Sequence, residues 1–189
     1  LSWYQLTIEP NTVFHSKPPP LPADNTLWDI QEQGQQLLTA HGYEQYEVSA
    51  YASPGKRCSH NLNYWQFGDY MAIGAGAHGK ITDLENQALF RYQKTRLPNN
   101  YPDPARPTTS SKKIIARDQL AFEFFMNGLR LNDGIPKQWL DTRTGLSVTD
   151  VTDRIQDAKA KGLLLETESN WQPSHRGKLF LNELLTIFL

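Results

Sequence analysis

The sequence predicts a mixed fold, of class α/β plus α+β, on the basis of two observations. Residues 1–51 read as strand, helix and strand, which is the order of the crossover unit of a parallel sheet. Residues 112–189 read as amphipathic helices, a short hairpin and a closing helix, an order typical of winged-helix domains. We therefore expect the C-terminal portion of an incomplete parallel βα (TIM-like) barrel, followed by a winged-helix-like helical domain.

The first strand is expected over Leu1–Glu9, which is rich in strand-forming residues and stops at Pro10, a residue that cannot donate to a ladder. After a proline-rich surface loop, Asp24 or Asn25 is expected to cap a helix that ends near Gly42. This helix would supply the crossover between the two strands of the unit.

The second strand is expected over Tyr43–Tyr51. Because two strands cannot close a barrel, the remaining strands are expected to lie upstream of Leu1. The Leu1–Glu9 strand would then present an unpaired edge, and such an edge favours self-association of the fragment.

Small residues dominate the segment from Gly74 to Gly79, which is interpreted as a glycine-rich strand ending at His78. No clear helix follows these glycines, so a Rossmann nucleotide site is rejected. A further strand is expected over Ala88–Thr95, and the proline-rich Leu97–Ser111 is interpreted as a linker. The predicted domains are therefore residues 1–96 and 112–189, joined by residues 97–111.

The C-terminal domain is expected to contain three helices and one hairpin. The helices are predicted over Lys112–Leu131, Ser147–Lys161 and Arg176–Leu189, and the hairpin is formed by Leu163–Glu166 and Trp171–Pro173. Although winged helices often bind DNA, acidic residues slightly outnumber basic ones from Ile114 onward. The charge that dominates nonspecific DNA binding is thus missing, and nucleic acid is not an expected partner.

The composition excludes several classes of protein. A formal net charge of -1 gives no global field for polyanions or anionic lipids. The single cysteine, Cys58, cannot form an internal disulfide, which indicates a reducing cytoplasm. No apolar stretch is long enough to span a membrane.

The most specific signal is a series of short motifs: HNLNYW at His60–Trp65, GDY at Gly68–Tyr70 and IGAGAHG at Ile73–Gly79. The blocks WYQLTIEPNT, GYEQYEVSAYA, EFFMNGLRL and HRGKLFLNELL accompany them in order. Together they resemble the C-terminal half of the HemW branch of the HemN-like radical SAM family. The resemblance covers nearly the whole chain.

The resemblance implies a partial barrel that holds a [4Fe-4S] cluster and S-adenosylmethionine. The family's CxxxCxxC cluster motif lies upstream, and three thiolate ligands cannot come from one cysteine. We therefore expect no radical chemistry from this chain alone. Thr7, Gly74, Gly76 and His78 would contribute only the far wall of the S-adenosylmethionine pocket.

The HNLNYW block is typical of the haem-chaperone branch, which is implied to bind haem and deliver it to respiratory enzymes, membrane-associated clients included. The resemblance assigns His60 as the haem-iron ligand and Asn61, Tyr64 and Trp65 as further haem-site residues. Two alternatives stay open: a fragment of an oxygen-independent coproporphyrinogen III oxidase, and a protein-contact domain without a ligand.

Other chemically active side chains have weaker assignments. Cys58 is either a thiolate haem ligand or a small hydrophobe, and the second interpretation is the commoner one. His78 either lines the S-adenosylmethionine cavity or merely ends a strand. Asp69 and Glu47 could form an acid and base pair, but nothing in the sequence fixes their separation, so they are interpreted as solvated or capping groups.

Overall fold

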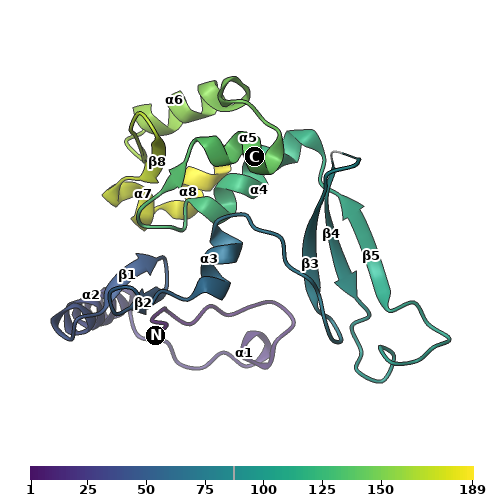
Figure 1. Ribbon diagram of the computed structural model, residues 1–189. Coiled ribbons are helices and arrows are strands. Elements are labelled where there is room, and N and C mark those ends of the chain that lie inside the picture. Colours follow the sequence, from purple (N-terminus) through teal and green to yellow (C-terminus); the bar gives the residue numbers. More distant parts are fainter. Residues whose placement is uncertain (87) are drawn as a thin grey trace. The chain divides into compact units, whose positions relative to one another are not determined.

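The computed structural model describes residues 1–86 and 88–189. These residues form two compact units, Leu1–Cys58 and Ser59–Leu189 (Figure 1). The sequence instead predicted a linker over residues 97–111. The observed boundary precedes the HNLNYW motif, because the strands that follow this motif pack with the C-terminal helices rather than with the N-terminal segment.

The first unit is built around one long helix. It contains α1 (Val13–Ser16), α2 (Asp24–Ala40), β1 (Glu44–Glu47) and β2 (Ala50–Ala52). The prediction of α2 is confirmed at its C-terminal end, where Gly42 follows the helix with a φ of 77°. The expected cap is wrong, because Ala23 occupies the N-cap position and makes no side-chain cap bond.

The two predicted strands of the first unit are not formed as expected. Residues 43–51 hold an antiparallel hairpin, in which Glu44 pairs with Ala52, instead of one strand. The chain reverses after Glu47, where the Gln45 side chain donates to the Val48 carbonyl at 3.0 Å.

The segment Leu1–Glu9 contains no strand and makes a single antiparallel bridge, from Ser2 to Ala50. The predicted parallel crossover is therefore wrong for the described residues. The expected self-association depended on an exposed edge of a Leu1–Glu9 strand, and this strand is not formed. Tyr4 and Leu6 nevertheless remain exposed.

The second unit begins with α3 (Ser59–Trp65) and continues into an antiparallel meander. Its strands are β3 (His78–Asp83), β4 (Ala88–Lys94) and β5 (Thr109–Ile114), in the order β3-β4-β5. β4 confirms the strand expected over Ala88–Thr95.

Two neighbouring predictions are wrong. The glycine-rich segment is a loop, and His78 begins a strand instead of ending one. The linker is shorter than predicted because residues 109–114 pair with β4 along its free edge.

The C-terminal elements start with α4 (Arg117–Gly128), later than the predicted Lys112. They continue with β6 (Ile135–Pro136), α5 (Gln138–Thr144), the 3-10 helix η1 (Val148–Val151), α6 (Thr152–Ala160), β7 (Leu164–Glu166), β8 (Asn170–Pro173), α7 (His175–Leu179) and α8 (Leu181–Thr186). The β7–β8 hairpin is confirmed and gains β6 as a third strand, in the order β6-β8-β7. The predicted closing helix is split at Phe180, and β6 and α5 were not predicted.

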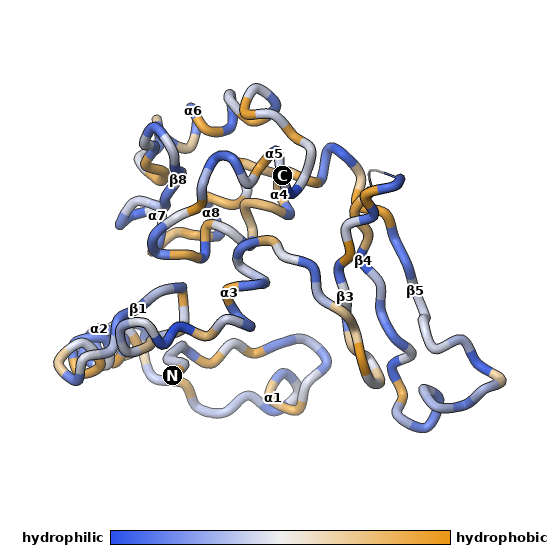
Figure 2. The backbone as a smooth tube through the Cα atoms, in the orientation of Figure 1, coloured by the Kyte–Doolittle hydropathy of each residue, from blue (hydrophilic) through white to orange (hydrophobic). Residues whose placement is uncertain are grey.

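The core of the second unit contains a cluster of aromatic side chains. Phe125 stacks on Phe188 with ring centroids 4.0 Å apart, and Trp171 lies 5.4 Å from Phe125. All three side chains are buried. Figure 2 shows hydrophobic residues on the α4 and α8 segments that supply this core. No described helix is long and apolar enough to cross a membrane.

An acid-dependent ion cluster ties the β7–β8 hairpin to its neighbours. Glu166 binds Lys159 at 2.6 Å and Lys137 at 2.9 Å, and it accepts the Trp171 indole N–H at 3.1 Å. Hydrogen bonds from Lys159 and Lys137 lower the pKa of Glu166 from 4.5 to about 2. Because the carboxylate is favoured in the folded state, its stabilisation is present above about pH 4.5 and is lost as pH falls through about 2.

We expect the melting temperature of the wild-type chain to fall between pH 5 and pH 2 more steeply than that of Glu166→Gln. The glutamine variant keeps the shape of the side chain but has no charge to lose. Circular dichroism melts across this range measure the difference. Parallel curves for the two proteins would contradict the assignment of acid sensitivity to Glu166.

Candidate functional site

The HNLNYW motif forms the helix α3, which the sequence did not predict. His60 and Tyr64 are four residues apart and therefore lie on the same face of this helix. Their rings meet edge to face, with centroids 4.8 Å apart and an interplanar angle of 87°. The structure thus brings together two of the four predicted haem-site residues.

The His60 imidazole is accessible. Its residue is exposed, and across residues 1–86 and 88–189 no hydrogen bond engages either ring nitrogen. A metal ion could therefore bind a nitrogen lone pair without displacing a protein partner.

Trp65 packs against the core of the second unit instead of joining His60. The Arg130 guanidinium lies over the Trp65 ring, 4.3 Å from its centroid. The Trp65 indole N–H is buried and has no hydrogen-bond partner in the described part of the chain. Asn61 is half-buried. Trp65 therefore anchors the C-terminal end of α3, while His60 stays free at the other end.

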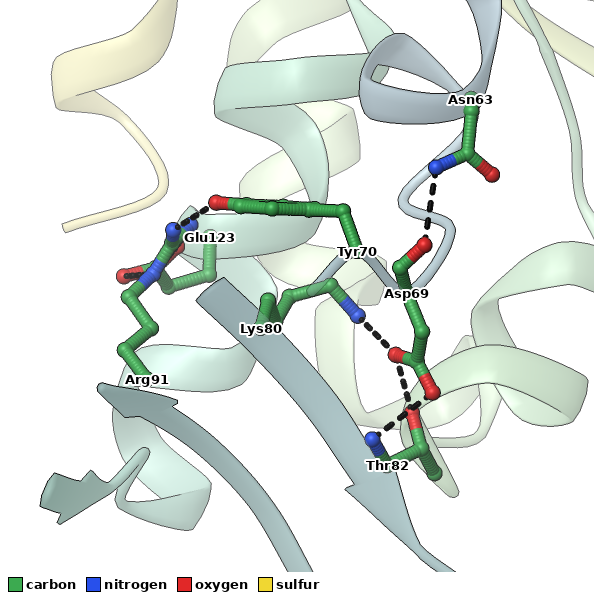
Figure 3. A network of polar contacts seen from close by, with 7 residues as sticks. All are labelled: Asn63, Asp69, Tyr70, Lys80, Thr82, Arg91 and Glu123. Carbon is green, nitrogen blue, oxygen red and sulfur yellow. Dashed lines mark hydrogen bonds and ion pairs between the residues drawn. The ribbon is translucent and has the colours of Figure 1, made fainter. Parts of the chain in front are cut away.

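The GDY motif ties α3 to the meander (Figure 3). The Asp69 carboxylate accepts from Lys80 Nζ at 2.9 Å and from the Thr82 amide at 2.8 Å. The Asp69 backbone carbonyl accepts from Asn63 Nδ2 at 2.9 Å. Gly68 is required at this corner because a Cβ would lie 2.1 Å from Asn63 Oδ1. The motif is thus a structural clamp between α3 and β3.

The Asp69–Lys80 pair is unusual because Lys80 is almost completely buried. Partial burial raises the pKa of Asp69, but hydrogen bonds from Lys80 and Thr82 outweigh it and hold this pKa below its usual value. Burial lowers the pKa of Lys80, and the pair with Asp69 offsets that effect only in part. Asp69 is therefore ion-paired instead of merely solvated. Glu47, in the other unit, is buried and accepts from Ser49 Oγ at 3.1 Å, so its predicted solvation is wrong.

A second network, which the sequence did not reveal, continues from Tyr70. Its hydroxyl accepts from Arg91 Nη1 at 2.8 Å, and Arg91 Nε lies 3.1 Å and 3.2 Å from the two carboxylate oxygens of Glu123 (Figure 3). The Tyr70 ring meets Tyr64 edge to face at 4.5 Å. In the sequence, the two end residues of this network stand out only as members of motifs. Tyr70 ends GDY, and Glu123 begins EFFMNGLRL.

The residues expected at the S-adenosylmethionine wall belong to both units. Thr7 is exposed in the first unit, whereas Gly74, Gly76 and His78 belong to the second. Gly74 and Gly76 have φ values of 98° and 71°, which favour glycine. The Gly74 amide donates to the Tyr101 hydroxyl at 3.2 Å. These glycines therefore have a local backbone reason to be present.

Comparison with known proteins gives a family match and a similar solved structure. Residues 115–180 match the family described as the HemN C-terminal domain. Over 88% of its length, the chain also resembles 42% of a solved chain of coproporphyrinogen III oxidase (HemN) from Escherichia coli, a radical SAM enzyme, with a TM-score of 0.63 and 15% identity. Residues 115–180 of the second unit are thus similar to the HemN C-terminal domain, and most of the chain shares the HemN fold.

The full length of the chain is similar to proteins named heme chaperone HemW. It is 53% identical over 189 residues to that of Escherichia coli (strain K12) and covers 49% of that protein. It is 31% identical over 195 residues to that of Bacillus subtilis (strain 168) and covers 50% of it. The chain is therefore a homologue of the HemW-type proteins and spans about half the length of the curated relatives it matches.

Proposed function

We propose that this chain carries the haem-ligating portion of a HemW-type haem chaperone, with His60 as the ligand of the haem iron. The observation that supports this most directly is the exposed His60 imidazole, whose ring nitrogens bind no other described group. Haem is proposed as the cargo because the relatives in Escherichia coli and Haemophilus influenzae are named heme chaperones.

The residues around His60 fit haem as a cargo. Neutral imidazole is a common axial ligand of haem iron. The Tyr64 ring beside it offers an apolar surface to a porphyrin edge. Cys58, two positions earlier, is also exposed and is the competing ligand that an experiment must separate from His60. In this proposal Asn61 and Trp65 shape α3 instead of touching iron.

The remaining expectations for the full-length protein are proposed with this function. They are a [4Fe-4S] cluster and S-adenosylmethionine outside this chain, with Thr7, Gly74, Gly76 and His78 at the pocket's far wall. They also include a cytoplasmic location for the protein and delivery of haem to respiratory proteins, membrane-associated clients included. A winged-helix-like arrangement is proposed for the C-terminal helices and the β7–β8 hairpin, and the strands of the partial barrel are proposed to lie outside this chain. The single cysteine does not supply the three thiolates of a cluster site, so no reaction step is assigned to these residues.

We expect a Soret titration of haem into the chain to give a histidine-ligated spectrum that His60→Ala loses, with affinity weaker by about tenfold or more. His175→Ala is the matched control, because His175 is also exposed at the start of a short helix. Cys58→Ala tests thiolate ligation separately. An unchanged spectrum and affinity for His60→Ala, in this chain and in the full-length protein, would show that the iron ligand lies elsewhere.

A further inference from the structure

A continuous series of side-chain contacts leads from α4 to His60, and every member belongs to the second unit. Glu123 on α4 binds Arg91 on β4, and Arg91 donates to the Tyr70 hydroxyl at 2.8 Å. The Tyr70 ring contacts the Tyr64 ring with centroids 4.5 Å apart, and the Tyr64 ring contacts His60 at 4.8 Å. Figure 3 shows the polar end of this series.

Each contact restricts the next side chain. Both carboxylate oxygens of Glu123 face the guanidinium of Arg91, an arrangement that fixes orientation as well as distance. The hydrogen bond to its hydroxyl holds the far end of the Tyr70 ring. The two edge-to-face contacts, at interplanar angles of 73° and 87°, then limit the rotation of Tyr64 and His60.

His60 needs such support because its own helix provides little. α3 has only seven residues, and helices this short are not stable by themselves. An exposed imidazole without a hydrogen bond would otherwise populate several rotamers. An axial ligand must aim one nitrogen at the iron, and a side chain held in one rotamer loses less entropy on binding.

We propose that Tyr70 and Tyr64 are positioning residues, held by the Arg91–Glu123 pair, that orient the His60 imidazole toward haem iron. This inference rests on the proposed function and deepens it. It gives the HemN C-terminal domain, to which Glu123 belongs, a direct part in haem ligation. A purely structural role for the two rings predicts a change in stability without a change in the His60 ring.

The experiment compares ring removal with ring retention. We expect Tyr64→Leu and Tyr70→Leu to weaken haem binding by about tenfold. Tyr64→Phe keeps the ring, and its haem affinity should stay within about twofold of the wild-type value. Tyr70→Phe keeps the ring but loses the bond from Arg91, and about a threefold loss is expected. Tyr101→Leu is the matched control, since this half-buried tyrosine bonds Gly74 and lies outside the series.

A second measurement uses the haem-free protein. The ¹³C and ¹⁵N resonances of the His60 ring should move or broaden in Tyr70→Phe and in both leucine variants, and should stay unchanged in Tyr101→Leu. Wild-type His60 resonances and haem affinity in a folded Tyr70→Leu or Tyr70→Phe would overturn the inference. If His60→Ala binds haem as the wild type does, the proposed function fails first, and the positioning role fails with it. If only His60→Ala loses ligation, the proposed function survives and the inference alone is wrong.

Discussion

Phe125→Ala is expected to lower the free energy of unfolding of the second unit by about 3–5 kcal/mol. Phe125 is 0% exposed and lies at the centre of the aromatic core. It stacks on Phe188 with ring centroids 4.0 Å apart and contacts Trp171 at 5.4 Å. Alanine would leave a cavity between a helix, a strand and the C-terminal segment, and interiors packed at crystal-like density close such cavities only in part.

Urea unfolding followed by tryptophan fluorescence measures this loss, because Trp171 reports directly on the same core. Phe180→Ala is the matched control, since Phe180 is 51% exposed and is expected to cost less than about 1 kcal/mol. Equal losses for the two variants would contradict the placement of Phe125 at the centre of the core.

Asp69→Ala is the second large effect, and we expect it to cost about 3 kcal/mol. The substitution leaves the Lys80 ammonium buried without its carboxylate, over the ring of Phe67 at 4.2 Å. It also removes the acceptor for the Thr82 amide. The loss is at the lower end of the range for buried pairs because the Asp69 side chain is 39% exposed to water.

The double variant Asp69→Ala/Lys80→Met distinguishes the cost of an unpaired charge from that of a lost contact. Methionine fills similar volume without a charge, so the double variant should recover most of the stability that Asp69→Ala loses. Asp103→Ala, which breaks the exposed pair with Arg106, should cost less than about 1 kcal/mol. A double variant as unstable as Asp69→Ala would show that the buried charge is not the cause.

The sequence by itself determined those structural features that depend on interactions between residues close together in the chain. The end of α2 was predictable because Gly42 adopts a left-handed conformation that stops a helix, and Gly162 acts in the same way after α6. The β7–β8 hairpin was predictable because its two strands are neighbours in sequence. HNLNYW pointed to His60 because the motif itself contains the side chain that we propose as the haem ligand.

Only the tertiary structure decided the pairings between distant residues. The segment Leu1–Glu9 has the composition of a strand. Among the described residues, its only bridge pairs Ser2 with Ala50, which lies 48 positions away in the sequence. Residues 109–114 form a strand because β4 offers a free edge, although their serines and threonines resemble a linker. The contacts that orient His60 depend on Arg91 and Glu123, which are 32 residues apart. Side-chain type and spacing cannot specify such contacts, because their geometry exists only after the chain has folded.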